Sequence, residues 1–374
     1  MKSKLIVLIL TAVLILSLGI VGCTPAADST SSPAPATGET INWVVQSKNP
    51  TIQPAVQVMV AGLQERVKKA TGGKFIITVN EPGAIVAKDE EWDGVQSGTL
   101  DAAFTTMVNN KGVFGPISGL FNEYAGSPNP DAWAAWYHHG DGLKYMQELA
   151  DKHGYDNVLC MGPVSLAGAE DEMWSNRKIN SIADYDGLKI RTFGDWGKIL
   201  ADLGASVIYL PAGEVYQALE RGIIDATELS GRATDLTFGL HEVCDYCYYP
   251  GVHAPAATAD LYVNRDSFEA LPPEYQQILE LEVRYSAMTT LLLMPVINGE
   301  ATLEFIEYGV EFVELPIDVQ AYIIQKADEM WNGYGAEDPF FQEVYDNQKA
   351  FVKAYTSVAN VIQPNVPMLL DYDL

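Results

Sequence analysis

Apolar and polar positions alternate along the first part of the chain in a way that predicts strands separated by amphipathic helices. Short runs rich in β-branched and aromatic residues predict strands over 41–47, 74–80 and 101–106. Between them, apolar residues recur at three- and four-residue spacing, which predicts helices at about 55–70 and 89–96. Strands that alternate with helices pair in parallel through crossover connections, so this region is expected to form an α/β lobe.

A second region repeats this plan. Within 187–228, strand patterns at LKIRT, SVIYLP and IIDAT enclose two segments with helical spacing. The stretch VQSGTLDA at 95–102 is echoed by LERGIIDA at 219–226, and each has a glycine suited to end a helix in left-handed geometry. Two similar lobes that face each other through the carboxyl ends of their strands form a ligand cleft. The candidate cleft residues follow such strand ends, namely Arg191, 105–109 and 228–230.

The last third of the chain predicts long helices. Helical patterns cover 272–293, 296–308, a stretch from Pro316 to Trp331, and 340–359. These helices would either brace a two-lobed body or offer a surface to a partner, and the sequence leaves both open. The apolar stretch near Leu291 is too short to span a bilayer and is expected to be a buried helix.

Residues 1–22 have the pattern of a lipoprotein signal peptide. Two lysines precede an apolar run that ends in IVG, and Cys23 follows as the expected site of lipidation. The alternative is an uncleaved membrane anchor, because the run is nearly long enough to span a bilayer. The polar tract that completes 23–40 has too little apolar surface to fold and is expected to be a flexible tether.

The charge of the chain limits its partners. With 49 acidic and 23 basic side chains, the formal net charge is −26. Such a balance argues against nucleic acid and anionic lipid as partners, so membrane contact is expected through the lipid anchor alone. An anionic ligand would have to be attracted by a local basic group, which gives each arginine near the cleft more weight.

Motifs of common enzymes are absent from the sequence. There is no GxSxG, P-loop, HExxH or GxGxxG stretch. The pair His138 and His139 would face different ways on a helix, and Cys244 and Cys247 lie in a strand-like run without a second CxxC. We therefore expect a binding protein and not an enzyme.

Arg191 is the residue best suited to bind a small organic acid. A guanidinium group presents a planar fork that meets a carboxylate with two parallel hydrogen bonds. The alternative is a surface arginine paired with a neighbour such as Asp195.

The stretch GLKIRTFGDWGKILADLGASVIYLPAGEVYQALERGIIDATE at 187–228 resembles the signature region of the extracytoplasmic solute-binding proteins of TRAP transporters, the DctP family. TGGKFIITV, VQSGTLDAAF and CYYPGVHAP follow the expected order, and the last two resemble the branch that binds α-keto acids and related 2-oxo or 2-hydroxy acids. The resemblance implies a type II periplasmic-binding-protein fold with parallel-dominated sheets, a cleft between the lobes and long C-terminal helices. It divides the chain into lobe I at 41–165, completed by about 255–310, lobe II at 166–254, completed by the C-terminal helices, and a helical segment at 311–374.

The resemblance also implies roles for individual residues. The arginine of LKIR, here Arg191, clamps the carboxylate of the substrate. We expect the rim of the open cleft at Met107 to Asn109. In the α-keto acid branch a metal cation lies beside the carboxylate, with ligands that match Glu228 and His253, although no cofactor is required. A further contact corresponds to Glu170. The alternative role of Glu228 is to neutralise Arg191 or to hydrogen-bond the hinge.

This chain departs from the branch at several positions. Leu229 and Val252 stand where tryptophans are usual, Glu170 and His253 stand where glutamines are usual, and Thr105–Asn110 replaces an aromatic pair. Imidazole suits transition metals better than Na⁺ or Ca²⁺. The loss of the indole walls predicts a ligand other than pyruvate, such as a larger or branched acid.

Together these features predict an extracytoplasmic, lipid-anchored protein at the periplasm or cell surface. It would close over a small organic acid and deliver it to the membrane subunits of a TRAP transporter, and it could form a homodimer. The alternative is a lipoprotein that presents its ligand to a signalling receptor.

Overall fold

The computed structural model describes residues 38–122 and 124–362. The predicted signal peptide, the lipidated Cys23 and nearly all of the tether lie outside the described residues, as does 363–374. The described residues from Thr40 onward form one compact unit. No helix in the described ranges is both long and apolar enough to cross a bilayer.

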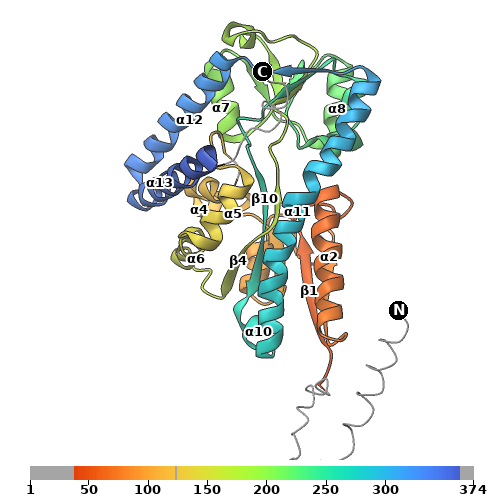
Figure 1. Cartoon of the computed structure of the whole chain (residues 1–374), viewed down its shortest axis with the longest axis vertical. Coiled ribbons are helices and arrows are strands. Elements are labelled where there is room, and N and C mark those ends of the chain that lie inside the picture. Colours follow the sequence, from red (N-terminus) through yellow and green to blue (C-terminus); the bar gives the residue numbers. More distant parts are fainter. Residues whose placement is uncertain (1–37, 123, 363–374) are drawn as a thin grey trace, which may run out of the picture. The chain divides into compact units, whose positions relative to one another are not determined.

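The first sheet has the strand order β2-β1-β3-β10-β4. Figure 1 labels β1, β4 and β10 of this sheet. Its strands are β1 (Ile41–Ser47), β2 (Phe75–Asn80), β3 (Ala102–Thr105), β4 (Val158–Ala167) and β10 (Ala257–Asn264). β1 pairs in parallel with β2 and β3, as the alternating pattern predicts, whereas β10 runs antiparallel to β3 and β4. The strand that joins β3 to β4 in this sheet is therefore β10, which lies far along the chain.

The second sheet has the strand order β11-β9-β5-β8-β6-β7. Its strands are β5 (Met173–Ser175), β6 (Lys189–Arg191), β7 (Ser206–Ile208), β8 (Ala226–Thr227), β9 (Tyr246–Tyr249) and β11 (Glu311–Glu314). The pairs β6–β7, β6–β8 and β9–β11 are parallel, and β5 is antiparallel to β8 and β9. Both sheets thus combine parallel pairs with antiparallel ones, and the predicted repeat of the α/β plan is present.

Helices cover both sheets and complete the unit. The α-helices are α2 (Pro54–Ala70), α3 (Glu91–Gln96), α4 (Lys111–Phe114), α5 (Pro130–His139), α6 (Gly142–Lys152), α7 (Gly194–Asp202), α8 (Ala212–Glu220), α9 (Arg232–Thr237), α10 (Arg265–Glu269), α11 (Pro273–Tyr308), α12 (Ile317–Glu337) and α13 (Pro339–Ile362). Short 3₁₀ turns are η1 (Met107–Asn110), η2 (Pro116–Phe121), η3 (Ile182–Tyr185) and η4 (Leu240–Glu242).

α11 corrects one expectation. The sequence predicts two helices that end and begin around Pro295, but the structure has one helix of 36 residues with this proline inside it. Its first half packs against α2 and contacts β4 through Thr290, and its second half contacts α9 through Asn298. Tertiary contacts on both sides of the proline outweigh the local preference for a break. The expectation of a buried apolar stretch here is also wrong in part, since Leu292 is 67% exposed and Val296 is 56% exposed.

Two short connections link the sheets and carry the site. Residues 168–172 lead from β4 to β5, and residues 250–256 lead from β9 to β10. They lie side by side, because Glu170 N–H donates to Ala254 O at 3.1 Å and Glu172 N–H donates to Tyr248 O at 2.8 Å. Chain segments that cross between two lobes are the positions where a hinge motion would be absorbed.

Cys244 and Cys247 belong to the core of the second sheet's lobe. Cys244 and Cys247 are buried and free in the same apolar cluster as Trp174, and burial raises the pKa of the Cys244 thiol to about 12. Thiols held in this protonated form are poor nucleophiles and poor metal ligands.

Asp260 of β10 yields a stability prediction. It is fully buried, it accepts a hydrogen bond from Tyr262 Oη at 3.1 Å, its Oδ1 atom has no partner, and burial raises the pKa of its carboxyl to about 8. Because the folded pKa lies above the unfolded one, the wild type loses stability as pH rises from about 4 to about 8, by at most ~1.4 kcal/mol per pH unit. Asp260→Asn should therefore be more stable than wild type near pH 8 and equal near pH 4. Thermal unfolding at both pH values checks this, and equal stability near pH 8 would contradict it.

Candidate functional site

The site begins at the carboxyl ends of two neighbouring parallel strands. Arg191 is the last residue of β6, and Glu228 directly follows β8, in a register that places Arg191 opposite Thr227. Arg191 Nη1 donates to Glu228 O at 2.8 Å and lies 3.3 Å from Glu228 Oε1, while Nε donates to Leu210 O at 3.0 Å. These contacts use Nε and Nη1 of the guanidinium.

Arg191 and Glu228 are a buried ion pair. They are 6% and 5% exposed, and burial raises the pKa of Glu228, against the attraction of His253 and Arg191. The sequence alternative that paired Arg191 with Asp195 is not what the structure has. Asp195 instead accepts from Lys111 Nζ at 2.9 Å and from Lys198 Nζ at 2.8 Å.

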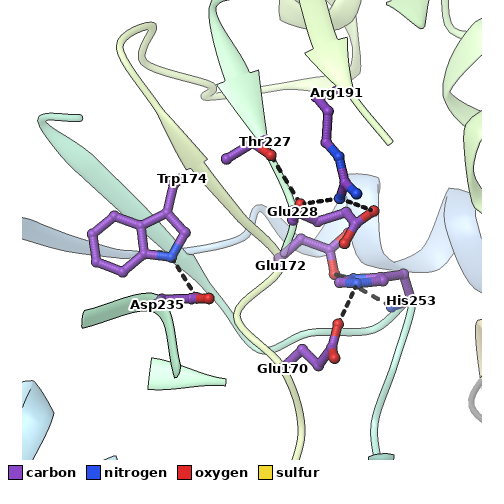
Figure 2. Close-up of polar contacts among 8 residues, drawn as sticks. All are labelled: Glu170, Glu172, Trp174, Arg191, Thr227, Glu228, Asp235 and His253. Carbon is purple, nitrogen blue, oxygen red and sulfur yellow. Dashed lines mark hydrogen bonds and ion pairs between the residues drawn. The ribbon is translucent and has the colours of Figure 1, made fainter. Parts of the chain in front are cut away.

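His253 and two glutamates extend the cluster from the connections between the sheets (Figure 2). His253 Nδ1 lies 3.0 Å from Glu172 Oε2, and its Nε2 lies 3.5 Å from Glu170 Oε2. The imidazole ring stacks on Trp196 of α7 at 5.3 Å between ring centres. The structure thus brings together four predicted site residues, Glu170, Arg191, Glu228 and His253, and adds Glu172.

A cavity of about 250 Å³ opens beside this cluster. Its polar lining includes Asn109, Lys111, Glu170, Asp195, Glu228 and His253. Its apolar lining includes Val108, Ala125, Trp196, Ile199, Met330 and Trp331. A ligand with a carboxylate at one end and an apolar body would match this lining.

Two predicted residues lie elsewhere. Met107 is fully buried in the core and does not line the cavity. The Met107 side chain therefore packs into the core at the start of η1. The next two residues, Val108 and Asn109, line the cavity. Leu229 lines a second cavity, of about 270 Å³, which shares Glu170 with the first and extends over Ser165, Thr234 and Asn298.

Three side chains could hold a metal ion. One ligand atom each of Glu170, Glu228 and His253 lies within 4.8 Å of the others. Na⁺ and Ca²⁺ are hard ions that prefer oxygen ligands, whereas one of these donors is an imidazole nitrogen. The donor set therefore does not suit the predicted Na⁺ or Ca²⁺, and the metal stays a prediction.

Several contributors were not predicted from the sequence. Glu172 lies 81 residues from His253, and Lys111 lies 84 residues from its partner Asp195. Trp174 donates to Asp235 Oδ2 at 2.8 Å beside the cluster. No local spacing signals such contacts; the one available hint for Glu172 is the acidic run AEDE just before a strand pattern.

Comparisons with known proteins identify the family of the chain. The family of bacterial extracellular solute-binding proteins, family 7 (DctP), matches residues 46–338. The chain is 31% identical to the monocarboxylate 2-oxoacid-binding periplasmic protein of Nostoc sp. over 77% of this chain and 78% of that protein.

Solved structures share the fold. A TRAP transporter solute-binding protein from Bordetella bronchiseptica, with calcium and picolinate in its active site, is 27% identical and covers 87% of this chain and 95% of its own, with a TM-score of 0.78. Another from Colwellia psychrerythraea, with calcium and pyruvate, is 24% identical and covers 89% of this chain and 100% of its own, with a TM-score of 0.79. The predicted resemblance is confirmed: the chain belongs to the DctP family of bacterial extracellular solute-binding proteins, which are TRAP-type receptors and not enzymes.

Proposed function

We propose that this chain captures a small monocarboxylic acid, with a 2-oxo or 2-hydroxy group, and delivers it to the membrane subunits of a TRAP transporter. The observation that carries the proposal is Arg191, a buried guanidinium at a strand end that contacts Glu228, one of the residues that line a cavity with polar and apolar side chains. The related protein of Nostoc sp. is named for binding 2-oxoacids, which supports the same class of ligand here.

In this proposal, closure of the two lobes sequesters the acid. The carboxylate docks on Arg191, and the lobes approach by bending at 168–172 and 250–256, which excludes water and strengthens the ion pair. Lys111 lies on α4, after β3 of the first sheet, and Asp195 lies on α7, after β6 of the second sheet. Both residues line the cavity, and their ion pair measures 2.9 Å. Binding affinity then depends on closure as well as on direct contact.

The proposal is tested by calorimetric titration of the purified protein with mono-, 2-oxo, 2-hydroxy and dicarboxylates. We expect saturable binding of monocarboxylic 2-oxo or 2-hydroxy acids. Failure of every carboxylate to bind would contradict it. The alternative is a lipoprotein that presents its ligand to a signalling receptor. Gene context distinguishes the two functions. Neighbouring genes for a small and a large membrane-spanning subunit favour transport, whereas a neighbouring gene for a sensor kinase favours signalling.

Asp195 yields a prediction about closure. It accepts hydrogen bonds from Lys111, Lys198 and Tyr334, and although burial opposes its charge, the two lysines hold its pKa below the ordinary value. Asp195→Asn should speed release of the acid several-fold, consistent with about 1 kcal/mol for a partly buried ion pair. Stopped-flow dissociation measures this, with Glu329→Gln on α12 as the control, since Glu329 is an exposed partner of Lys326. Equal release rates for the two variants would contradict the role of Asp195.

Membrane attachment is also part of the proposal. Cys23 ends the apolar run IVG and would carry the lipid. Cys23→Ala should move the protein from the membrane fraction to the soluble fraction in its native host. Retention in the membrane would instead favour the uncleaved anchor.

A homodimer stays a prediction, and the exposed apolar side chains of α11 offer a surface for a second copy.

A further inference from the structure

α11 carries apolar side chains on two opposite faces. The inward face is buried in the cores of both lobes, through residues that include Leu279, Val283 and Phe305. Residues three or four apart share one face of a helix, and at this spacing a second apolar stripe runs along the outward face. A helix that is apolar on all sides is normally buried, so the outward stripe has the character of a surface that another chain covers. Its exposed side chains are Leu281, Tyr285, Met288, Leu292, Val296 and Leu303.

Gly299 interrupts this stripe and indicates a close neighbour. It is exposed in the interior of α11, where a glycine makes a helix less stable than an alanine would. The packing of its own chain does not require the glycine, because a Cβ atom added there would meet nothing within 4 Å. It also borders a cavity of about 330 Å³. The missing side chain therefore leaves room for a group from outside the chain.

The charges beside the stripe favour a second copy that runs in the opposite direction. Arg284 is exposed on the first half of α11. Parallel α11 helices would place the glutamates of the second half beside their own copies, where like charges repel. Antiparallel helices bring Arg284 to the level of these glutamates and also oppose the two helix dipoles. The same acidic side chains disfavour an anionic lipid surface as the occupant. The exposed glutamates are Glu300, Glu304 and Glu307.

The stripe is complementary to itself in the antiparallel direction. If the two-fold axis passes near Leu292, residues at equal distances before and after it lie level with each other in the two copies. Leu281 then lies level with Leu303, and Met288 lies level with Val296. Every one of these pairs joins two apolar side chains, so the register leaves the stripe covered along its length.

The largest side chain of the stripe also faces its smallest position in this register. Tyr285 and Gly299 lie at equal distances from Leu292, so the tyrosine of one copy lies level with the glycine of the other. Both copies make the same contacts, as an isologous interface requires. One helix face is smaller than the interface of a permanent dimer, so association should depend on protein concentration.

We propose that the outward stripe of α11 is a dimer interface, on which a second copy of this chain lies antiparallel with Leu292 near the two-fold axis. The inference goes beyond the proposed function and does not depend on the identity of the acid. Because the first half of α11 packs on α2 and the second half contacts α9, each copy would touch both lobes of the other.

Thiol cross-linking tests the register. The cysteines of the described ranges are buried, so an introduced surface thiol is the accessible one there. Leu292→Cys should be joined to its own copy by a short bismaleimide, because the axis brings the two residues together. Leu281→Cys should not be joined to itself but should be joined to Leu303→Cys in an equimolar mixture. Ile223→Cys, exposed on the second lobe outside α11, is the control and should remain uncoupled, as should the wild type. Equal self-coupling of Leu281→Cys and Leu292→Cys would indicate parallel helices, and that result or no coupling of Leu292→Cys would overturn the inference.

Sedimentation over a range of concentrations tests the association itself. The wild type should show a monomer–dimer equilibrium, whereas Leu292→Glu, which places a charge from each copy at the axis, should remain monomeric. Ile223→Glu is the matched control and should associate like the wild type, with circular dichroism to show that both variants are folded. A wild type that is monomeric at every concentration, or a dimer that Leu292→Glu leaves intact, would overturn the inference. Acid titration of the same samples decides the proposed function separately.

Discussion

Replacement of Arg191 by methionine is expected to abolish detectable binding of 2-oxo acids. The guanidinium is buried beside the cavity, and methionine keeps much of its length without the charge or the hydrogen bonds. Truncation of one partner in a buried, hydrogen-bonded charge pair costs about 2 to 5 kcal/mol, which is about 30-fold to a few thousand-fold in affinity. Calorimetric titration of wild type and Arg191→Met with the same acid measures the effect.

Two further variants separate binding from folding. Arg191→Met leaves Glu228 buried without its partner, so the double variant Arg191→Met with Glu228→Gln restores a neutral pair and should fold while still failing to bind. Arg232 is the matched control, because it is also paired with a buried carboxylate, that of Asp171, at 2.9 Å, while its Nη1 donates to Thr302 on α11. Arg232→Met should lose stability but keep acid affinity. Unchanged affinity in Arg191→Met would show that Arg191 is not the clamp.

A branched acid is expected to bind more tightly than pyruvate. The cavity beside the cluster measures about 250 Å³ and continues from the polar end into a wall that includes Ile199, Met330 and Trp331. 4-Methyl-2-oxopentanoate has three more carbon atoms than pyruvate, and burial of each contributes about 0.8 kcal/mol, so a gain of about 10- to 60-fold is expected. Competition titrations of the two acids against one protein sample give the ratio directly.

A variant that narrows the cavity provides the control for this size preference. Val108 lines the wall and is only partly buried, so Val108→Trp adds volume with little disturbance of the core. It should weaken the branched acid by more than it weakens pyruvate. A preference for pyruvate in the wild type, or equal losses for both acids in Val108→Trp, would contradict the account of the apolar wall.

The strand ends are the part of the site that the sequence could predict. Hydrophobic periodicity located β6 and β8, and parallel pairing places the residues that follow such strands at one edge of a sheet. Arg191 and Glu228 meet there as expected. Glu170 and His253 were proposed from the family resemblance, and their convergence depends on the two connections between the sheets, whose pairing is not encoded in any local pattern.

The errors have physical causes as well. Pro295 is a strong local signal for a helix end, but contacts with β4, α2 and α9 hold α11 as one helix. Met107 follows a strand end, yet η1 turns its side chain into the core and leaves Val108 and Asn109 toward the cavity. Sequence position predicts that a residue is near a cleft; the local turn decides which side chain enters it.

A crystal structure of the protein with a bound 2-oxo acid tests the central claim most directly. The account predicts the carboxylate within hydrogen-bonding distance of the Arg191 guanidinium and beside His253, with the carbon chain toward Ile199 and Trp331. Density for the acid in the second cavity, beside Leu229 and away from Arg191, would contradict it.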